Sequence, residues 1–144
     1  MITIRSISRQ DYEQWLPLWL SNTENKVAEA ITQNTWNALC HKSRPVYGLG
    51  AFENGDMKAI LHYVLHATTG SLKSVCYMQD LFVHEKFRGR GIAKEMLRQL
   101  EKIGKDHQWE RIYWIAAESN TAAQRLYKHI GFKLDFSFYV LPIR

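Results

Sequence analysis

The sequence of 144 residues has only two cysteines, three prolines and no long run of apolar residues. Two isolated cysteines, Cys40 and Cys76, are too few to indicate a disulfide framework or a zinc site. A membrane-spanning helix needs roughly 20 consecutive apolar residues, and no stretch approaches that length. Residues 1–5 lack the apolar centre of a signal peptide. We therefore expect a cytoplasmic protein with no metal centre and no membrane span.

The chain also lacks a block of charge of one sign, although it is basic overall. It has 19 Lys and Arg residues against 14 Asp and Glu residues, for a formal net charge of +5. The basic residues are spread out, and their densest group surrounds residues 86–94, so no long run can follow a nucleic-acid backbone. This charge favours an anionic small ligand, and nucleic acid is only a distant alternative.

Apolar and aromatic residues, by contrast, are plentiful, at 46% and 12% of the chain. That composition and length predict one packed domain over residues 1–144. Pro17 must kink, shift or end the first helix, and Asn54-Gly55 predicts a tight hairpin turn. Gly104 and Gly131 are expected to end helices. In chain order, the expected elements are a strand at 2–7, helices at 9–20 and 24–39, strands at 46–52, 57–66 and 75–83, a helix at 92–103, a strand at 111–117, a helix at 121–130 and a strand at 136–141.

The order β-α-α-β-β-β-α-β-α-β predicts an α/β domain with a mixed central sheet flanked by helices. Its most informative loop joins the strand at 75–83 to the helix at 92–103, and reads Arg88-Gly89-Arg90-Gly91-Ile92-Ala93. N–H groups at a helix start lack intrahelical partners and favour phosphate, which glycine allows to approach closely. The loop therefore predicts a diphosphate-containing ligand. The arginines either add charge to that site or are solvated surface side chains.

Several segments together resemble the GCN5-related N-acetyltransferase (GNAT) superfamily. The loop at 88–93 fits its acetyl-CoA pattern, Arg/Gln-x-x-Gly-x-Gly/Ala. The other matching segments, in family order and spacing, are residues 77–83, Glu118-Ser119-Asn120, Leu126-Tyr127 and Ile130-Gly131-Phe132. A dinucleotide-binding loop would need a third glycine, which is missing. Within the superfamily, the chain looks closest to small-amine and polyamine-type enzymes and their histone-acetyltransferase-like relatives.

The resemblance implies the GNAT fold and acetyl-CoA as acetyl donor. The strand at 81–83 would pair with the pantetheine arm, and the amides of the loop at 88–93 would hold the pyrophosphate. Asn120 would contact the cofactor arm, although it also suits a helix N-cap, and Thr121 with Gln124 fits a capping box. The expected cofactor-binding residues are Leu81, Phe82, Val83, Arg88, Gly89, Arg90, Gly91, Ile92, Ala93, Asn120 and Tyr127.

Acetyl transfer to an amine needs a neutral nitrogen and a proton donor for the departing thiolate. Tyr127 matches the family tyrosine that approaches the thioester sulfur and is the expected acid, the alternative being a core tyrosine. Small-amine relatives often carry two acidic residues where this chain has Gln79 and Asp80. Asp80 or Glu118 is therefore the expected base or amine anchor. In a regular strand, Gln79 and Asp80 would point to opposite faces.

The resemblance predicts direct acetyl transfer to a primary amine of a small molecule in a ternary complex. A protein lysine or N-terminal acetyltransferase stays open as an alternative, as does a non-catalytic acyl-CoA-binding module. The strand at 136–141 is apolar enough to pair with a second subunit, which leaves a homodimer open. Aromatic residues in the first half could either wall the acceptor site or lie in the core, namely Trp15, Trp19 and Trp36.

Overall fold

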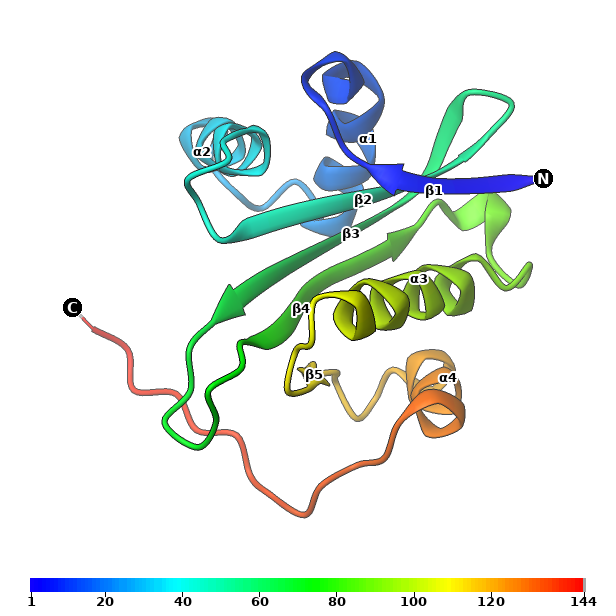
Figure 1. Ribbon diagram of the computed structural model, residues 1–144. Coiled ribbons are helices and arrows are strands. Elements are labelled where there is room, and N and C mark those ends of the chain that lie inside the picture. The colour runs from blue at the N-terminus through cyan, green and yellow to red at the C-terminus, as the bar shows by residue number, and fades with distance from the viewer. Residues whose placement is uncertain (144) are drawn as a thin grey trace.

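Within residues 1–143, which the computed structural model describes, five strands form one sheet with helices on both faces (Figure 1). Arg144, the last residue of the predicted domain, lies outside this range. The strand order is β1-β2-β3-β4-β5. The first four strands are antiparallel to their neighbours, and β4 and β5 are parallel, which confirms the mixed sheet.

The elements follow the predicted order from the first strand to the last helix. They are β1 (Ile2–Ser6), η1 (Arg9–Asp11), α1 (Tyr12–Asn22), α2 (Glu29–Cys40), β2 (Val46–Glu53), β3 (Asp56–His66), β4 (Val75–Val83), η2 (Glu85–Phe87), α3 (Ile92–Asp106), β5 (Ile112–Tyr113) and α4 (Thr121–Ile130). The α/β class is confirmed. No helix in residues 1–143 has both the length and the apolar character needed to cross a membrane.

The two faces of the sheet have separate apolar cores, because alternate side chains of each strand point to opposite faces. On one face, α3 contributes the fully buried Met96 and Leu100, which pack against Leu61 of β3. On the other face, α1 and α2 contribute tryptophans that pack around Ile60. The sheet therefore separates the glycine loop and α3 from the aromatic layer below α1.

Pro17 lies inside α1, as the predicted range 9–20 allowed, and the helix continues to Asn22. One predicted helix boundary was wrong. Gly104 does not end α3, which continues to Asp106. A Cβ at Gly104 would lie 2.8 Å from Cε3 of Trp109, so glycine makes room for that indole.

The last two predicted strands also differ from the structure, because one is shorter and the other is absent. β5 contains only Ile112 and Tyr113 of the range 111–117 that was predicted. Residues 136–141 form no strand, although the sequence predicted one. A strand requires a neighbouring strand for its hydrogen bonds, and the described chain provides none beside these residues.

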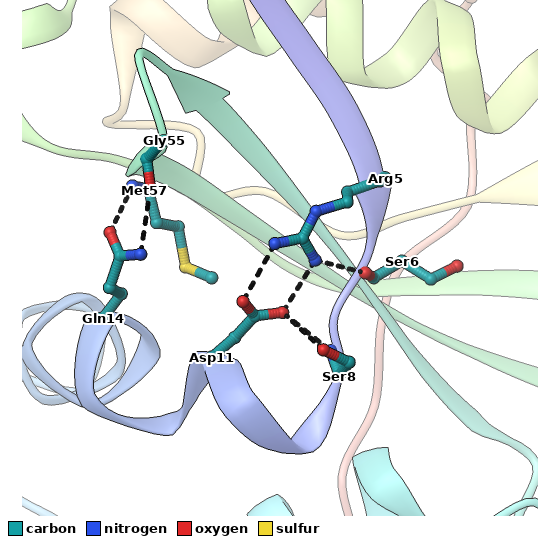
Figure 2. A network of polar contacts seen from close by, with 7 residues as sticks. All are labelled: Arg5, Ser6, Ser8, Asp11, Gln14, Gly55 and Met57. Atoms are coloured by element: carbon teal, nitrogen blue, oxygen red, sulfur yellow. Dashed lines mark hydrogen bonds and ion pairs between the residues drawn. The ribbon is translucent and has the colours of Figure 1, made fainter.

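A polar network anchors α1 to the sheet (Figure 2). Arg5 of β1 donates two hydrogen bonds, of 2.8 and 3.0 Å, to the buried Asp11 carboxylate. The Ser8 backbone N–H donates to the same carboxylate at 2.8 Å. One turn later, the Gln14 side chain accepts from Met57 N–H at 2.7 Å and donates to the Gly55 carbonyl at 3.1 Å. These contacts fix α1 against the β2–β3 hairpin.

We predict that Asp11→Asn lowers the free energy of unfolding at pH 7 by about 1–3 kcal/mol, because it breaks a charge-assisted pair at a buried carboxylate. The hydrogen bond from Arg5 holds the pKa of Asp11 below its ordinary value. This stabilisation is therefore present above the unfolded pKa of about 3.9 and is lost as the pH falls through the lower folded pKa. Urea unfolding at pH 7 and pH 3 measures both effects.

The control is Asp135→Asn, at an exposed aspartate of the C-terminal segment. An equal loss of stability in both variants at pH 7 would contradict this role of Asp11.

Candidate functional site

Strand β4 is covered by neighbouring strands along only part of its length. One edge pairs with β3 from Val75 to Val83. The other edge pairs with β5 only at Cys76–Ile112 and Tyr77–Tyr113. From residue 78 to residue 83, one edge of β4 therefore has no strand beside it in the described chain. An extended ligand can add to such an edge as a further strand would.

A β-bulge lies at the start of this open edge. Asp80 pairs with His62 and Met78 pairs with Tyr63, so Gln79 is an extra residue in β4. An extra residue shifts the alternation of faces. Met78 is buried in the core below α3, whereas Asp80 lies beside His62 on the α1 side. Our expectation of regular alternation at Gln79 and Asp80 was therefore wrong, and Gln79 is exposed at the bulge.

The Asp80 carboxylate is held by neighbours from two other elements. Its Oδ1 accepts a hydrogen bond of 3.2 Å from Asn22 Nδ2, at the end of α1. Its Oδ2 lies 3.0 Å from His62 Nδ1, in β3. The Asp80 side chain is 21% exposed and that of His62 is 3% exposed. The Asp80 carboxylate therefore stays partly accessible to solvent, while Asn22 and His62 fix its orientation.

Trp15 determines which nitrogen of His62 carries the proton. The Trp15 indole N–H lies 3.0 Å from His62 Nε2, and an indole N–H can only donate. Nε2 must therefore accept, which leaves Nδ1–H to donate to Asp80. A doubly protonated imidazole would place an N–H against the indole N–H. His62 is accordingly neutral in this arrangement.

Sequence reasoning missed Asn22 and His62. The available signal for His62 was an imidazole in the middle of a predominantly apolar stretch, residues 59–65. Trp15, Trp19 and Trp36, which could wall the acceptor site or lie in the core, are buried in one apolar core. Trp15 is fully buried, and its ring centre lies 5.4 Å from that of Trp19 and 4.9 Å from that of Trp36.

The glycine loop leads directly into α3. Gly89 and Gly91 have φ angles of +78° and +80°. Nothing lies within 4 Å of the position of a Cβ at either residue, so the backbone conformation requires glycine here. Gly91 is the N-cap of α3, and no side chain in the described range caps this helix start. The N–H groups of the first turn, which includes Ile92 and Ala93, are therefore available to an anion.

Both arginines of the loop contact the protein. The Nε–H of Arg88 donates to the Val83 carbonyl at 2.9 Å, and its guanidinium lies 5.2 Å from the centre of the Phe82 ring. Arg90 donates to both Glu53 carboxylate oxygens, at 3.2 and 2.6 Å. The arginines thus tie the loop to the ends of β4 and β2, and neither is a free solvated side chain.

The remaining predicted residues lie around α4. The Asn120 side chain caps the helix by accepting from Ala123 N–H at 3.2 Å, so the predicted capping box at Thr121 was wrong. Tyr127 packs against Trp114, and burial raises the pKa of its phenol. Glu118 is 81% exposed and pairs with Lys133 at 2.6 Å, and that hydrogen bond lowers the pKa of Glu118.

Known proteins resemble the chain over nearly its whole length. Residues 4–132 match the acetyltransferase (GNAT) family. A D-amino-acid N-acetyltransferase of Saccharomyces cerevisiae is 26% identical over 143 residues, which cover 96% of this chain and 89% of the relative. A spermine/spermidine N(1)-acetyltransferase of Bacillus subtilis is 30% identical over 144 residues, which cover 94% of this chain and 93% of the relative.

A solved structure of AAC(6′)-Iy with the bisubstrate analogue CoA-S-monomethyl-acetylneamine has the same fold. Its TM-score is 0.84 at 18% identity, and the alignment covers 100% of this chain and 99% of that one. The open edge of β4 and the uncapped start of α3 suit an extended cofactor that carries a diphosphate. The family match establishes that the chain belongs to the acetyltransferase (GNAT) family, and it is an acetyl-CoA-dependent N-acetyltransferase.

Proposed function

We propose that this enzyme transfers the acetyl group directly to a primary amine of a small molecule, with both substrates bound at once. The observation that carries the proposal is the Asp80 carboxylate, held by Asn22 and His62 next to the open edge of β4. A partly exposed carboxylate binds an alkyl ammonium. The named relatives that are 26% and 30% identical act on D-amino acids and on polyamines, and both classes present such a group.

We assign the binding of acetyl-CoA, the acetyl donor, to two stretches of backbone. The open edge at Leu81, Phe82 and Val83 offers an extended arm the backbone groups that do not pair with β3. The loop from Arg88 to Ala93 offers the free amides of a helix start to a diphosphate. Acetyl-CoA, when bound, supplies the thioester that is attacked. Asn120, which caps α4, is assigned to the cofactor arm, as the family resemblance implies.

Of the two candidate carboxylates, we assign the amine to Asp80. Asp80 already has two fixed neighbours, so it binds an ammonium without losing further side-chain freedom. It can then accept the amine proton directly or through water. Glu118 is an exposed side chain that pairs with Lys133, and its lowered pKa makes it a weaker base than an unpaired glutamate.

Tyr127 is assigned as the proton donor for the departing thiolate. Its pKa is raised by burial, so the phenol stays protonated at neutral pH and remains able to donate. The backbone N–H groups near Phe82 and Val83 are suited to stabilise the negative charge that develops on the carbonyl oxygen.

The proposed function predicts that release of free CoA thiol requires a small primary amine. A panel of D-amino acids, polyamines, an aminoglycoside and a lysine-containing peptide is tested with acetyl-CoA. We expect rapid release with at least one small amine and little with the peptide. Tyr127→Phe should slow release by about 100-fold or more while still binding acetyl-CoA. Turnover of the peptide alone would overturn the assignment to a small molecule.

A second prediction separates the two carboxylates. Asp80→Asn should lower kcat/KM for the amine by about 100-fold, because an amide offers one acceptor to two donors and carries no charge. Glu118→Gln, the matched control, should have a kcat/KM for the amine close to that of the parent enzyme. Steady-state kinetics with varied amine at saturating acetyl-CoA measures both. A large loss in Glu118→Gln together with a normal Asp80→Asn would reverse the assignment.

A further inference from the structure

Two tyrosines lie side by side on the α1 side of the sheet, on neighbouring strands. Tyr77 of β4 pairs with Tyr113 of β5, and their ring centres are 4.9 Å apart at an interplanar angle of 38°. Tyr77 stands between Cys76 and Met78, which both belong to the core below α3, so the Tyr77 side chain points to the opposite face. Contact with Tyr77 places the Tyr113 ring on that face too. The two rings therefore lie on the same side of the sheet as Asp80.

The β-bulge at Gln79 is what brings Asp80 onto this face. In a regular strand, residues 77 and 80 would point to opposite faces, because three steps separate them. The extra residue at the bulge puts both on one face. Asp80 pairs with His62 of β3, and Tyr77 pairs with Val64, which is two residues further along β3. Two strand steps separate Asp80 from the tyrosine pair by roughly 7 Å along the sheet.

The tyrosine pair is held in place by His66, at the end of β3. His66 Nδ1 lies 2.9 Å from the Ala67 carbonyl, which can only accept, so Nδ1 carries a proton. His66 Nε2 lies 2.9 Å from the Tyr113 hydroxyl, and the two rings meet edge to face with centres 5.7 Å apart. Tyr113 is nevertheless 38% exposed, and Tyr77 is half-buried. The pair is therefore fixed in orientation and still open to a ligand.

The Tyr77 phenol lies within the electrostatic field of Asp80. Burial raises the pKa of Tyr77, and negative charge at Tyr113 and at Asp80 raises it further. The Tyr77 ring therefore stays neutral at neutral pH. The surface thus has a charged end, the Asp80 carboxylate, and a neutral aromatic end, the tyrosine pair.

We propose that the acceptor is an arylalkylamine, a primary amine that carries an aromatic ring on a short alkyl chain. Its ammonium binds Asp80, and its ring packs against Tyr77 and Tyr113, because aromatic rings favour offset-stacked and edge-to-face contacts. This inference rests on the proposed function, in which Asp80 holds the amine, and adds the group that the enzyme selects. A second ammonium, as in a polyamine, would meet only rings here, since the carboxylate of this surface is already engaged at Asp80.

A comparison of three amines tests this selectivity. Phenethylamine, propylamine and putrescine are each varied at saturating acetyl-CoA, and release of free CoA thiol is measured. We expect kcat/KM for phenethylamine to exceed that for propylamine by about 10-fold, because the ring gains apolar burial and contact with the tyrosines. Equal values for phenethylamine and propylamine would overturn the proposal. A higher value for putrescine than for phenethylamine would overturn it as well.

Tyr113→Leu removes one ring of the pair, and Tyr47→Leu is the matched control. Tyr47 is 37% exposed and stacks on Tyr63, whose ring belongs to the core on the other face of the sheet. We expect Tyr113→Leu to lower the ratio of kcat/KM for phenethylamine to that for propylamine by about 3- to 10-fold. Tyr47→Leu should leave the ratio unchanged. Both amines are measured on the same variant, so a loss of folded enzyme cancels in the ratio.

The variants also have an outcome that contradicts the ring contact. An unchanged ratio in Tyr113→Leu, or an equal fall in Tyr47→Leu, would overturn it. Failure of this inference is distinguishable from failure of the proposed function. Turnover of propylamine and putrescine without any gain from the ring would overturn the arylalkylamine alone, whereas turnover of a lysine-containing peptide alone would overturn both.

Discussion

The divergence of β4 from β5 is the constraint on which the site depends. Parallel pairing stops at Tyr77–Tyr113, and the bulge at Gln79 follows two residues later in β4. If the two strands stayed paired, β5 would cover the backbone groups of residues 78–83. If the strand were regular, Asp80 would share a face with Met78 instead of facing the α1 side. The two irregularities together produce one open edge, to which we assign the acyl-CoA arm, and one carboxylate beside it.

The buried aromatic residues of α1 help to position the Asp80 carboxylate, although they lie far from it in the sequence. Arg5 and Asp11 hold the start of α1, which brings Trp15 and Asn22 to β3 and β4. Trp15 fixes the tautomer of His62, and His62 then donates to Asp80. A core tryptophan thus contributes to the orientation of Asp80 through His62. The packing of Trp15 therefore affects Asp80, because the indole N–H can only donate and the His62 imidazole must accept it at Nε2.

Structural features that depend on a few neighbouring residues could be predicted from the sequence. Features that depend on a contact with a distant segment of the chain could not. Asn54-Gly55 is sufficient to predict the β2–β3 hairpin, and the apolar run predicted β4 with its observed ends, Val75 and Val83. The glycine loop was similarly recognisable, because positive φ angles and a helix start both depend on a few neighbouring residues. The bulge at Gln79 depends on register with β3, and the role of His62 depends on Trp15. Neither relation is visible in a single segment.

The open edge of β4 can be tested most directly by amide hydrogen exchange, followed residue by residue with and without acetyl-CoA. Binding should slow exchange at the amides of the edge, residues 81–83, and of the loop, residues 89–93, and should leave the interior of β2 unchanged. Slower exchange at both places would support the backbone cradle. Acetyl-CoA binding that protects other residues and leaves both stretches unchanged would contradict it.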